Sequence, residues 1–129
     1  MSKNSWAQAK AQYEAIELLL EACDDADENG ETTLLVEDGY SDGPIDADQV
    51  LTFCYENVLD AARKGDEYEI LLCTGGPAVQ LVGPVDEYGI PFFAQLVHSD
   101  WGESWQTWPA LKAQADILLR YARLFYFGA

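Results

Sequence analysis

Apolar residues recur at steps of three and four near the start of the chain, and this pattern restricts the fold more than any other feature. The series is Trp6, Ala9, Tyr13, Ile16, Leu20 and Cys23. Such spacing places the side chains on one side of an α-helix, which other parts of the chain must then cover. Ser5 followed by Gln8 predicts a capping box at its start, and Asn29-Gly30 predicts its end. The sequence therefore predicts a long helix with one side in a core.

Carboxylates form a second stripe along the same predicted helix. They are Glu14, Glu17, Glu21, Asp24 or Asp25, and Glu28. Acids near a helix C-terminus oppose the helix macrodipole, so helix stability does not explain them. The stripe opens a stretch from Glu14 to Asp48 that holds thirteen acidic residues and no Lys or Arg.

The charge is unevenly distributed, and it excludes several classes of partner. The net charge is −16, of which −14 falls in residues 1–69 and −2 in residues 70–129. Nucleic-acid binding needs Lys and Arg against phosphates, and anionic membranes attract basic segments. We therefore expect no direct nucleic-acid or membrane binding, and a cation or a basic protein surface as partner. Hydrophobic residues make up 49% of the chain, which indicates a folded domain rather than an acidic tail.

The remaining pattern predicts a single α+β domain over residues 1–129. A second helix is expected from Asp46, with Gln49 as capping partner, to Arg63-Lys64-Gly65, and Pro109 is expected to open a third. Strands are expected at residues 32–36, 68–74, 78–85 and 92–99, with 38–44 as a loop. The predicted order is α-β-α-β-β-β-α, with three helices packed on a small antiparallel sheet of three to four strands.

Three cysteines and the absence of an apolar leader indicate the compartment. Cys23, Cys54 and Cys73 are too few and too far apart for a disulfide framework. Because Cys23 and Cys54 fall on apolar helix faces, we expect buried free thiols in a reducing compartment. No signal sequence and no stretch of 18 apolar residues occurs, so we expect a cytoplasmic protein.

One segment resembles half of an EF-hand calcium loop. Asp25, Asp27 and Asn29 occupy loop positions one, three and five, and Gly30 occupies position six, followed by Glu31. The second half fails, because position twelve is Val36 instead of a bidentate Glu. An acidic helix end with an Asn-Gly turn is the preferred interpretation, so no metal or other cofactor is expected, and a calcium-dependent module is an alternative.

Cys73, His98 and Asp100 could supply a nucleophile, a base and a residue that orients the base. Cys73 lies in an apolar run, however, and the chain has a single His. An inert thiol and a partly buried histidine are preferred, and a small Cys/His hydrolase is the second alternative. The Gly75-Gly76-Pro77 segment lacks a phosphate-binding frame and predicts a tight turn.

Three tryptophans fall within eight residues, at Trp101, Trp105 and Trp108. Tryptophan packs in cores and is also enriched at interface hot spots. A core position is preferred for Trp101 and Trp108. For Trp105 the core and a partner-facing position are equally favoured.

Several motifs of the C-terminal half resemble a group of small uncharacterised proteins of phages, prophages and plasmids. They are Glu69-Ile-Leu-Leu-Cys-Thr-Gly-Gly-Pro-Ala-Val, Asp86-Glu-Tyr-Gly, Asp100-Trp-Gly-Glu-Ser-Trp and Tyr121-Ala-Arg-Leu-Phe-Tyr-Phe-Gly. That group implies no settled activity and no site residues. In size and acidity the chain is similar to phage anti-restriction and anti-CRISPR inhibitors that imitate DNA, which is an analogy and not a homology.

The acidic stretch has three interpretations: a solubilising surface, a cation site, or a mimic of nucleic-acid phosphates. Mimicry is preferred because the acids sit in a cored domain and recur at phosphate-like spacing along one helix. We therefore expect a non-enzymatic inhibitor that blocks the basic nucleic-acid-binding surface of a host defence protein. The expected contact residues are Glu14, Glu17, Glu21, Asp24, Asp25, Asp27 and Glu28, with Trp105 as an apolar anchor.

Overall fold

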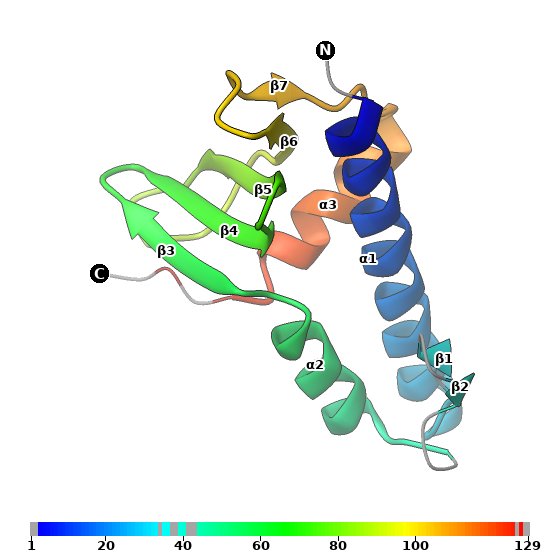
Figure 1. Cartoon of the computed structure of the whole chain (residues 1–129). Coiled ribbons are helices and arrows are strands. Elements are labelled where there is room, and N and C mark those ends of the chain that lie inside the picture. The colour runs from blue at the N-terminus through cyan, green and yellow to red at the C-terminus, as the bar shows by residue number, and fades with distance from the viewer. Residues whose placement is uncertain (1–2, 34, 37–38, 41–43, 126, 128–129) are drawn as a thin grey trace.

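The structure is a computed structural model that describes residues 3–33, 35–36, 39–40, 44–125 and 127. It contains three helices and two antiparallel sheets within those residues (Figure 1). The helices are α1 (Lys3–Asn29), α2 (Ala47–Glu56) and α3 (Lys112–Ala122). The strands are β1 (Leu35–Val36), β2 (Gly39–Tyr40), β3 (Asp60–Lys64), β4 (Glu67–Cys73), β5 (Pro77–Pro84), β6 (Gln95–Asp100) and β7 (Gln106–Thr107).

The main sheet is a five-stranded antiparallel meander in the order β3-β4-β5-β6-β7. Its register aligns Ile70 with Leu81 and Leu81 with Leu96, and all three side chains are fully buried. Successive side chains of a strand point to opposite faces, so one face of the sheet is the core face. The opposite face carries half-buried residues such as Leu71 and Val82. We call this opposite side the open face.

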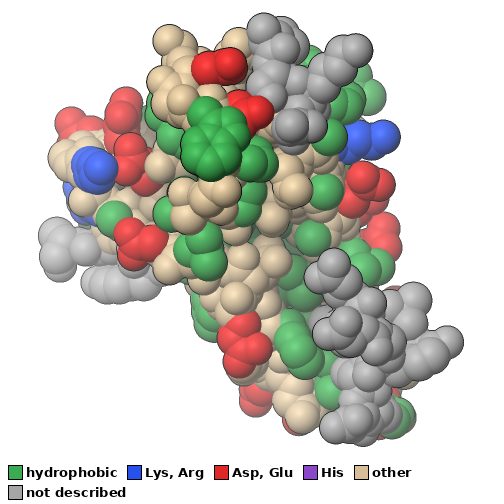
Figure 2. Space-filling view, viewed as in Figure 1, with side chains coloured by type: hydrophobic (Ala, Val, Ile, Leu, Met, Phe, Trp, Pro, Cys, Tyr) green, Lys and Arg blue, Asp and Glu red, His purple; other side chains and the backbone are tan. Residues whose placement is uncertain are grey.

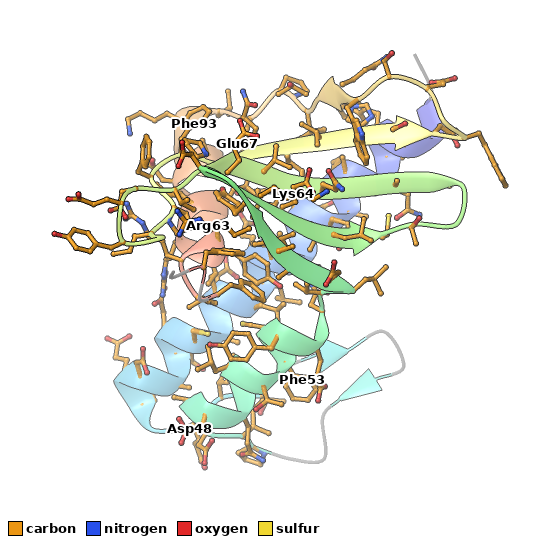
Figure 3. All side chains as sticks on the ribbon, turned by 90° about the vertical axis from the view of Figure 1, so that its left-hand side faces the viewer. Asp48, Phe53, Arg63, Lys64, Glu67 and Phe93 are labelled. Carbon is orange, nitrogen blue, oxygen red and sulfur yellow. The ribbon has the colours of Figure 1, made fainter. Side chains whose placement is uncertain are left out.

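Helices α1 and α3 cover the core face. Helix α1 contacts β5 and β6, α3 contacts β6, and α2 packs against α1. Figure 3 looks onto the open face, with α1 and α3 behind the sheet and α2 below it. The core cluster joins Ile16 of α1, Val50 of α2 and Leu118 of α3, all fully buried. No helix in the described part of the chain is both long enough and apolar enough to cross a bilayer.

The predicted fold class is confirmed, and the predicted strand number is wrong. The sheet has five strands instead of three or four, because residues 60–64 form the edge strand β3 and residues 106–107 form β7. Residues 60–64 were expected to end the second helix, but α2 ends at Glu56 with Asn57 as its C-cap. Gly65, with φ of 63°, belongs to the turn between β3 and β4. Hydrogen bonding to β4 in this tight hairpin outweighs the helix preference of alanine here.

Other boundaries also differ from the sequence expectations. Helix α3 begins at Lys112, three residues after Pro109, and the strand expected at 92–99 begins at Gln95 instead of residue 92. The expected strand at 32–36 contains β1 together with an isolated bridge from Thr32 to Ile45, and the expected loop at 38–44 contains β2. Residues 34, 37–38 and 41–43 of these segments lie outside the described residues. The capping box of Asp46 and Gln49 is confirmed, with both hydrogen bonds formed.

Candidate protein-binding surface

The acidic row of α1 occupies one strip of the helix surface. At about 100° per residue, Glu14, Glu17, Glu21, Asp24, Asp25 and Glu28 fall within an arc of roughly 100°. Asp27 falls about 60° outside this arc. The row extends about 21 Å along the helix axis from Glu14 to Glu28. We call these six residues the acidic row.

The acidic row borders the buried side of α1, which holds it in place. Tyr13, one turn before Glu17, and Ile16 are buried in the core. The Tyr13 ring stacks on Trp108 of the β7–α3 connection, with ring centroids 5.3 Å apart. The Tyr13 hydroxyl donates a 2.9 Å hydrogen bond to Glu17. Burial and the neighbouring Glu17 raise the pKa of Tyr13 to about 12. The carboxylates therefore sit on a helix fixed by packing.

Part of the charge in the acidic row is already engaged within the protein. Arg120 of α3 donates two hydrogen bonds to Asp24, of 3.0 and 2.5 Å. These bonds hold the pKa of the Asp24 carboxyl below its usual range. Asp25 accepts a 2.7 Å hydrogen bond from Asn29. Glu14, Glu21 and Glu28 are exposed on the same strip. The strongest negative potential therefore lies on the side of the row away from Arg120.

Acids in the second part of the stretch have different roles. Asp46 caps α2, accepting a 2.9 Å hydrogen bond from the backbone N–H of Gln49. Asp48 lies exposed in the first turn of α2, where a carboxylate is favourable to the helix dipole. Glu37, Asp38 and Asp42 lie outside the described residues. Asp46 and Asp48 thus have a role at the start of α2, whereas Glu14, Glu21 and Glu28 of the acidic row are exposed and have no role in helix capping.

The structure does not bring Trp105 together with the acidic row. Val79 and His98 pair across β5 and β6, and His98 faces α1, where its Nδ1 lies 2.9 Å from Ser5 Oγ. The next cross-strand pair, Ala78 and Ser99, points to the opposite side of the sheet, the open face. Trp105 lines a hollow together with these two residues. Trp105 and α1 therefore lie on opposite faces of the sheet.

The three clustered tryptophans have different environments. Trp108 is buried at 5% exposure, as predicted, and Trp105 is 47% exposed. The core position predicted for Trp101 is wrong, because its side chain is 81% exposed. Trp101 is followed by Gly102 in a turn, and both have positive φ, of 49° and 81°. The Trp-Gly pair directly after a strand was the available sequence signal for an exposed turn.

The half calcium loop does not form a loop. Asp25, Asp27 and Asn29 all belong to α1, and Glu31 follows its end. An EF-hand site needs these positions to wrap around the ion in a non-helical turn. Among the residues that the structure describes, no group of three or more His, Cys, Asp or Glu side chains is arranged to hold a metal ion. The local geometry therefore does not provide the non-helical loop on which the calcium alternative depends.

Cys73 and His98 are not brought together either. Both pair with Val79, which lies on the strand between theirs, so roughly 9.5 Å separates their backbones. The Cys73 thiol donates to the carbonyl of Pro77 at 3.6 Å, and burial raises its pKa. Ser5 occupies the Nδ1 side of His98. No nucleophile and base pair is assembled from these residues.

Ser5 therefore has a different role from the one its sequence context predicts. It lies inside α1, which extends back at least to Lys3, and it is 2% exposed. Its hydroxyl makes the contact with buried His98 instead of capping the helix. Cys54 of α2 is a buried free thiol, as predicted, whereas Cys23 of α1 is free but only half-buried. Their sulfurs lie 3.9 Å apart, and burial raises the pKa of both.

Buried His98 predicts a specific dependence of stability on pH. Burial lowers the pKa of His98 below its usual 6.5, so the folded state favours the neutral ring. Below about pH 6.5 the unfolded chain takes up a proton that the folded chain does not. The stability that His98 gives the folded state is therefore complete above that pH and is lost as the pH falls through it. The free energy of unfolding of the unaltered protein should therefore exceed that of the His98→Asn variant, and the difference should become smaller from about pH 8 to about pH 5.

The comparison of the two proteins isolates the histidine. Carboxylate repulsion also changes with pH, but it changes equally in both and cancels in the difference. Urea denaturation at each pH gives the two free energies. A margin that stays constant over this range would show that His98 is not held in its neutral form.

Searches of family models, of characterised proteins and of solved structures return no match for this chain. The resemblance to small phage and plasmid proteins therefore remains a prediction, and function has to be argued from the surface itself.

Proposed function

We propose that this chain is a non-enzymatic inhibitor whose acidic row binds the basic nucleic-acid-binding surface of a host defence protein. The observation that carries the proposal is the geometry of the row: six carboxylates within about 100° of one helix, over about 21 Å. Helix packing fixes their positions, so binding does not require ordering of a flexible tail. Nucleic-acid-binding surfaces use Lys and Arg to neutralise phosphates, and the carboxylates of the acidic row would take the place of those phosphates.

The charge distribution supports a protein partner in particular. Within the part of the chain that the structure describes, three of the seven Lys and Arg residues form ion pairs: Arg120 with Asp24, Lys64 with Glu69 at 2.8 Å, and Lys112 with Asp116 at 3.2 Å. A net charge of −16 steers a basic partner towards the protein and repels nucleic acid. In this proposal the inhibitor acts in the host cytoplasm, where the defence protein would meet its nucleic acid.

Charge reversal in the acidic row is the direct test. The triple variant Glu17→Lys/Glu21→Lys/Asp25→Lys would place positive side chains against the basic cleft of the partner. The two positive surfaces repel each other, so we expect inhibition to weaken by more than about 100-fold. The assay is a gel shift that measures how the protein competes with nucleic acid for purified restriction and CRISPR effector complexes. Inhibition by the unaltered protein should also weaken as salt rises.

A matched triple variant separates recognition from total charge. Asp66→Lys/Glu67→Lys/Glu87→Lys alters the net charge equally. All three residues are exposed, with Asp66 and Glu87 in turns and Glu67 at the start of β4, away from α1. This variant should inhibit nearly as well as the unaltered protein. If the α1 triple keeps its inhibition and its salt dependence, or if both triples lose inhibition equally, the acidic row is not the binding surface.

A further inference from the structure

A hollow of about 640 Å³ lies on the open face, at the end of the sheet where β4 turns into β5. Trp101 and Trp105 line it together with Glu103, and the turn at Gly75 and Gly76 forms another part of its wall. Figure 2 shows hydrophobic side chains beside carboxylates over the β6–β7 connection, with Lys and Arg visible only towards the lateral edges of that view. This hollow belongs neither to the acidic row nor to the core.

Trp101 is held in this hollow at a cost to the fold. Its φ of 49° is in the left-handed region, which is unfavourable for a bulky residue. The turn is fixed by a 3.1 Å hydrogen bond from Glu103 N–H to Asp100 O, and by another of 3.1 Å from Trp101 N–H to Gly76 O. The indole lies against Gly76 but remains 81% exposed. Core packing does not explain a strained backbone that presents an aromatic ring to solvent.

The charge around the hollow selects the kind of ligand. Glu103 is the one charged side chain among the lining residues, and residues 65–111 contain no Lys or Arg. Indole is the aromatic surface that attracts cations most strongly. A guanidinium group is flat, stacks on an aromatic ring and can pair with a carboxylate at the same time. A sugar would need several polar side chains, whereas Ser99 Oγ already donates a hydrogen bond to Glu103 O.

We propose that the hollow between Trp101 and Trp105 binds an arginine side chain of a partner protein, with the guanidinium against the indoles and near Glu103. The site lies on the opposite face of the sheet from α1, so it is a second recognition site that does not depend on the acidic row. An arginine is the expected occupant because the hollow is anionic, aromatic and open to a side chain that approaches from another surface.

The test is a titration of the whole protein with the peptide acetyl-Gly-Gly-Arg-Gly-Gly-amide, followed by NMR of the four indole N–H signals. The signals of Trp101 and Trp105 should shift saturably, while those of Trp6 and buried Trp108 should not. The same peptide with citrulline, which has the shape of arginine without the charge, should bind at least about tenfold more weakly. Trp105→Ala should abolish binding, and Glu103→Gln should weaken it about threefold to tenfold.

The variant Trp101→Asn separates a loss of peptide binding from a loss of folding. Asparagine suits a left-handed turn position before glycine, so this variant should melt at the same or a higher temperature and yet bind the peptide more weakly. Equal binding of the arginine and citrulline peptides would overturn the proposal, as would peptide-induced shifts confined to α1. Saturable shifts of Trp101 and Trp105 with cellobiose, without any response to the arginine peptide, would make the hollow a carbohydrate site instead.

Discussion

Replacing Gly83 by alanine is expected to lower the free energy of unfolding by about 3 kcal/mol or more, the upper end for overpacking a core. A Cβ atom at this position of β5 would lie 2.1 Å from Phe93 O, 2.9 Å from Phe93 C and 3.0 Å from Tyr68 Cε1. The carbonyl of Phe93 is backbone and cannot turn aside as a side chain could. It also accepts the 2.8 Å hydrogen bond of the Tyr68 hydroxyl, so moving it would disturb a second contact.

Urea denaturation of Gly83→Ala measures the loss, and Gly75→Ala is its control. Gly75 has φ of 95° but nothing within 4 Å of an added Cβ, so its replacement should cost only about 1–2 kcal/mol of backbone strain. If Gly83→Ala is no less stable than Gly75→Ala, the segment at Phe93 does not pack on β5 as the structure describes.

Removing the hydroxyl of Tyr121 is expected to lower the free energy of unfolding by about 1–3 kcal/mol. Tyr121 of α3 is fully buried, and its hydroxyl donates a 2.7 Å hydrogen bond to the carbonyl of Cys54 in α2. The same hydroxyl accepts a 3.3 Å hydrogen bond from Asn57. In Tyr121→Phe the buried carbonyl of Cys54 loses its partner and carries a desolvation penalty, whereas half-buried Asn57 can turn towards water.

Tyr55→Phe is the matched control for Tyr121→Phe. Both rings contact Phe125 edge to face, at 5.3 and 5.5 Å, and both hydroxyls donate to a backbone carbonyl. Tyr55 is 44% exposed, so water can replace its bond to Leu124 O and the loss should stay below about 1 kcal/mol. Thermal unfolding of the two variants gives the comparison. Equal losses would mean that the Tyr121 hydroxyl does not join α3 to α2.

The elements that the sequence predicted well carry their signals locally. The apolar series from Trp6 to Cys23 predicted α1, and the Asp46 and Gln49 pair predicted the start of α2. Turn residues between apolar runs predicted the β4-β5-β6 meander. Each signal depends on residues within a few positions of one another, since helix capping, helix periodicity and tight turns are short-range effects.

Most elements that were predicted wrongly depend on distant partners. Residues 60–64 are the exception, because they favour a helix by composition and yet pair with the adjacent strand β4 across a two-residue turn at Gly65 and Asp66, which makes the sheet one strand wider. Ser5 fits a capping box, yet it lies within α1 because its hydroxyl meets His98, 93 residues away. Trp101 and Trp108 have the same side chain, but Trp101 lies in the turn after β6 and is exposed, whereas Trp108 is buried in the core.

The sequence by itself determined the charge field, the α+β class and the two stripes of the first helix, because composition and helical period are properties of the chain alone. Only the tertiary structure decided how those surfaces are presented. It engages Asp24 with Arg120, keeps Cys73 away from His98, and sets Trp105 on the face of the sheet opposite α1. The physical reason is that strand register and helix packing fix which side chains meet, and both are settled by contacts between residues far apart in the chain.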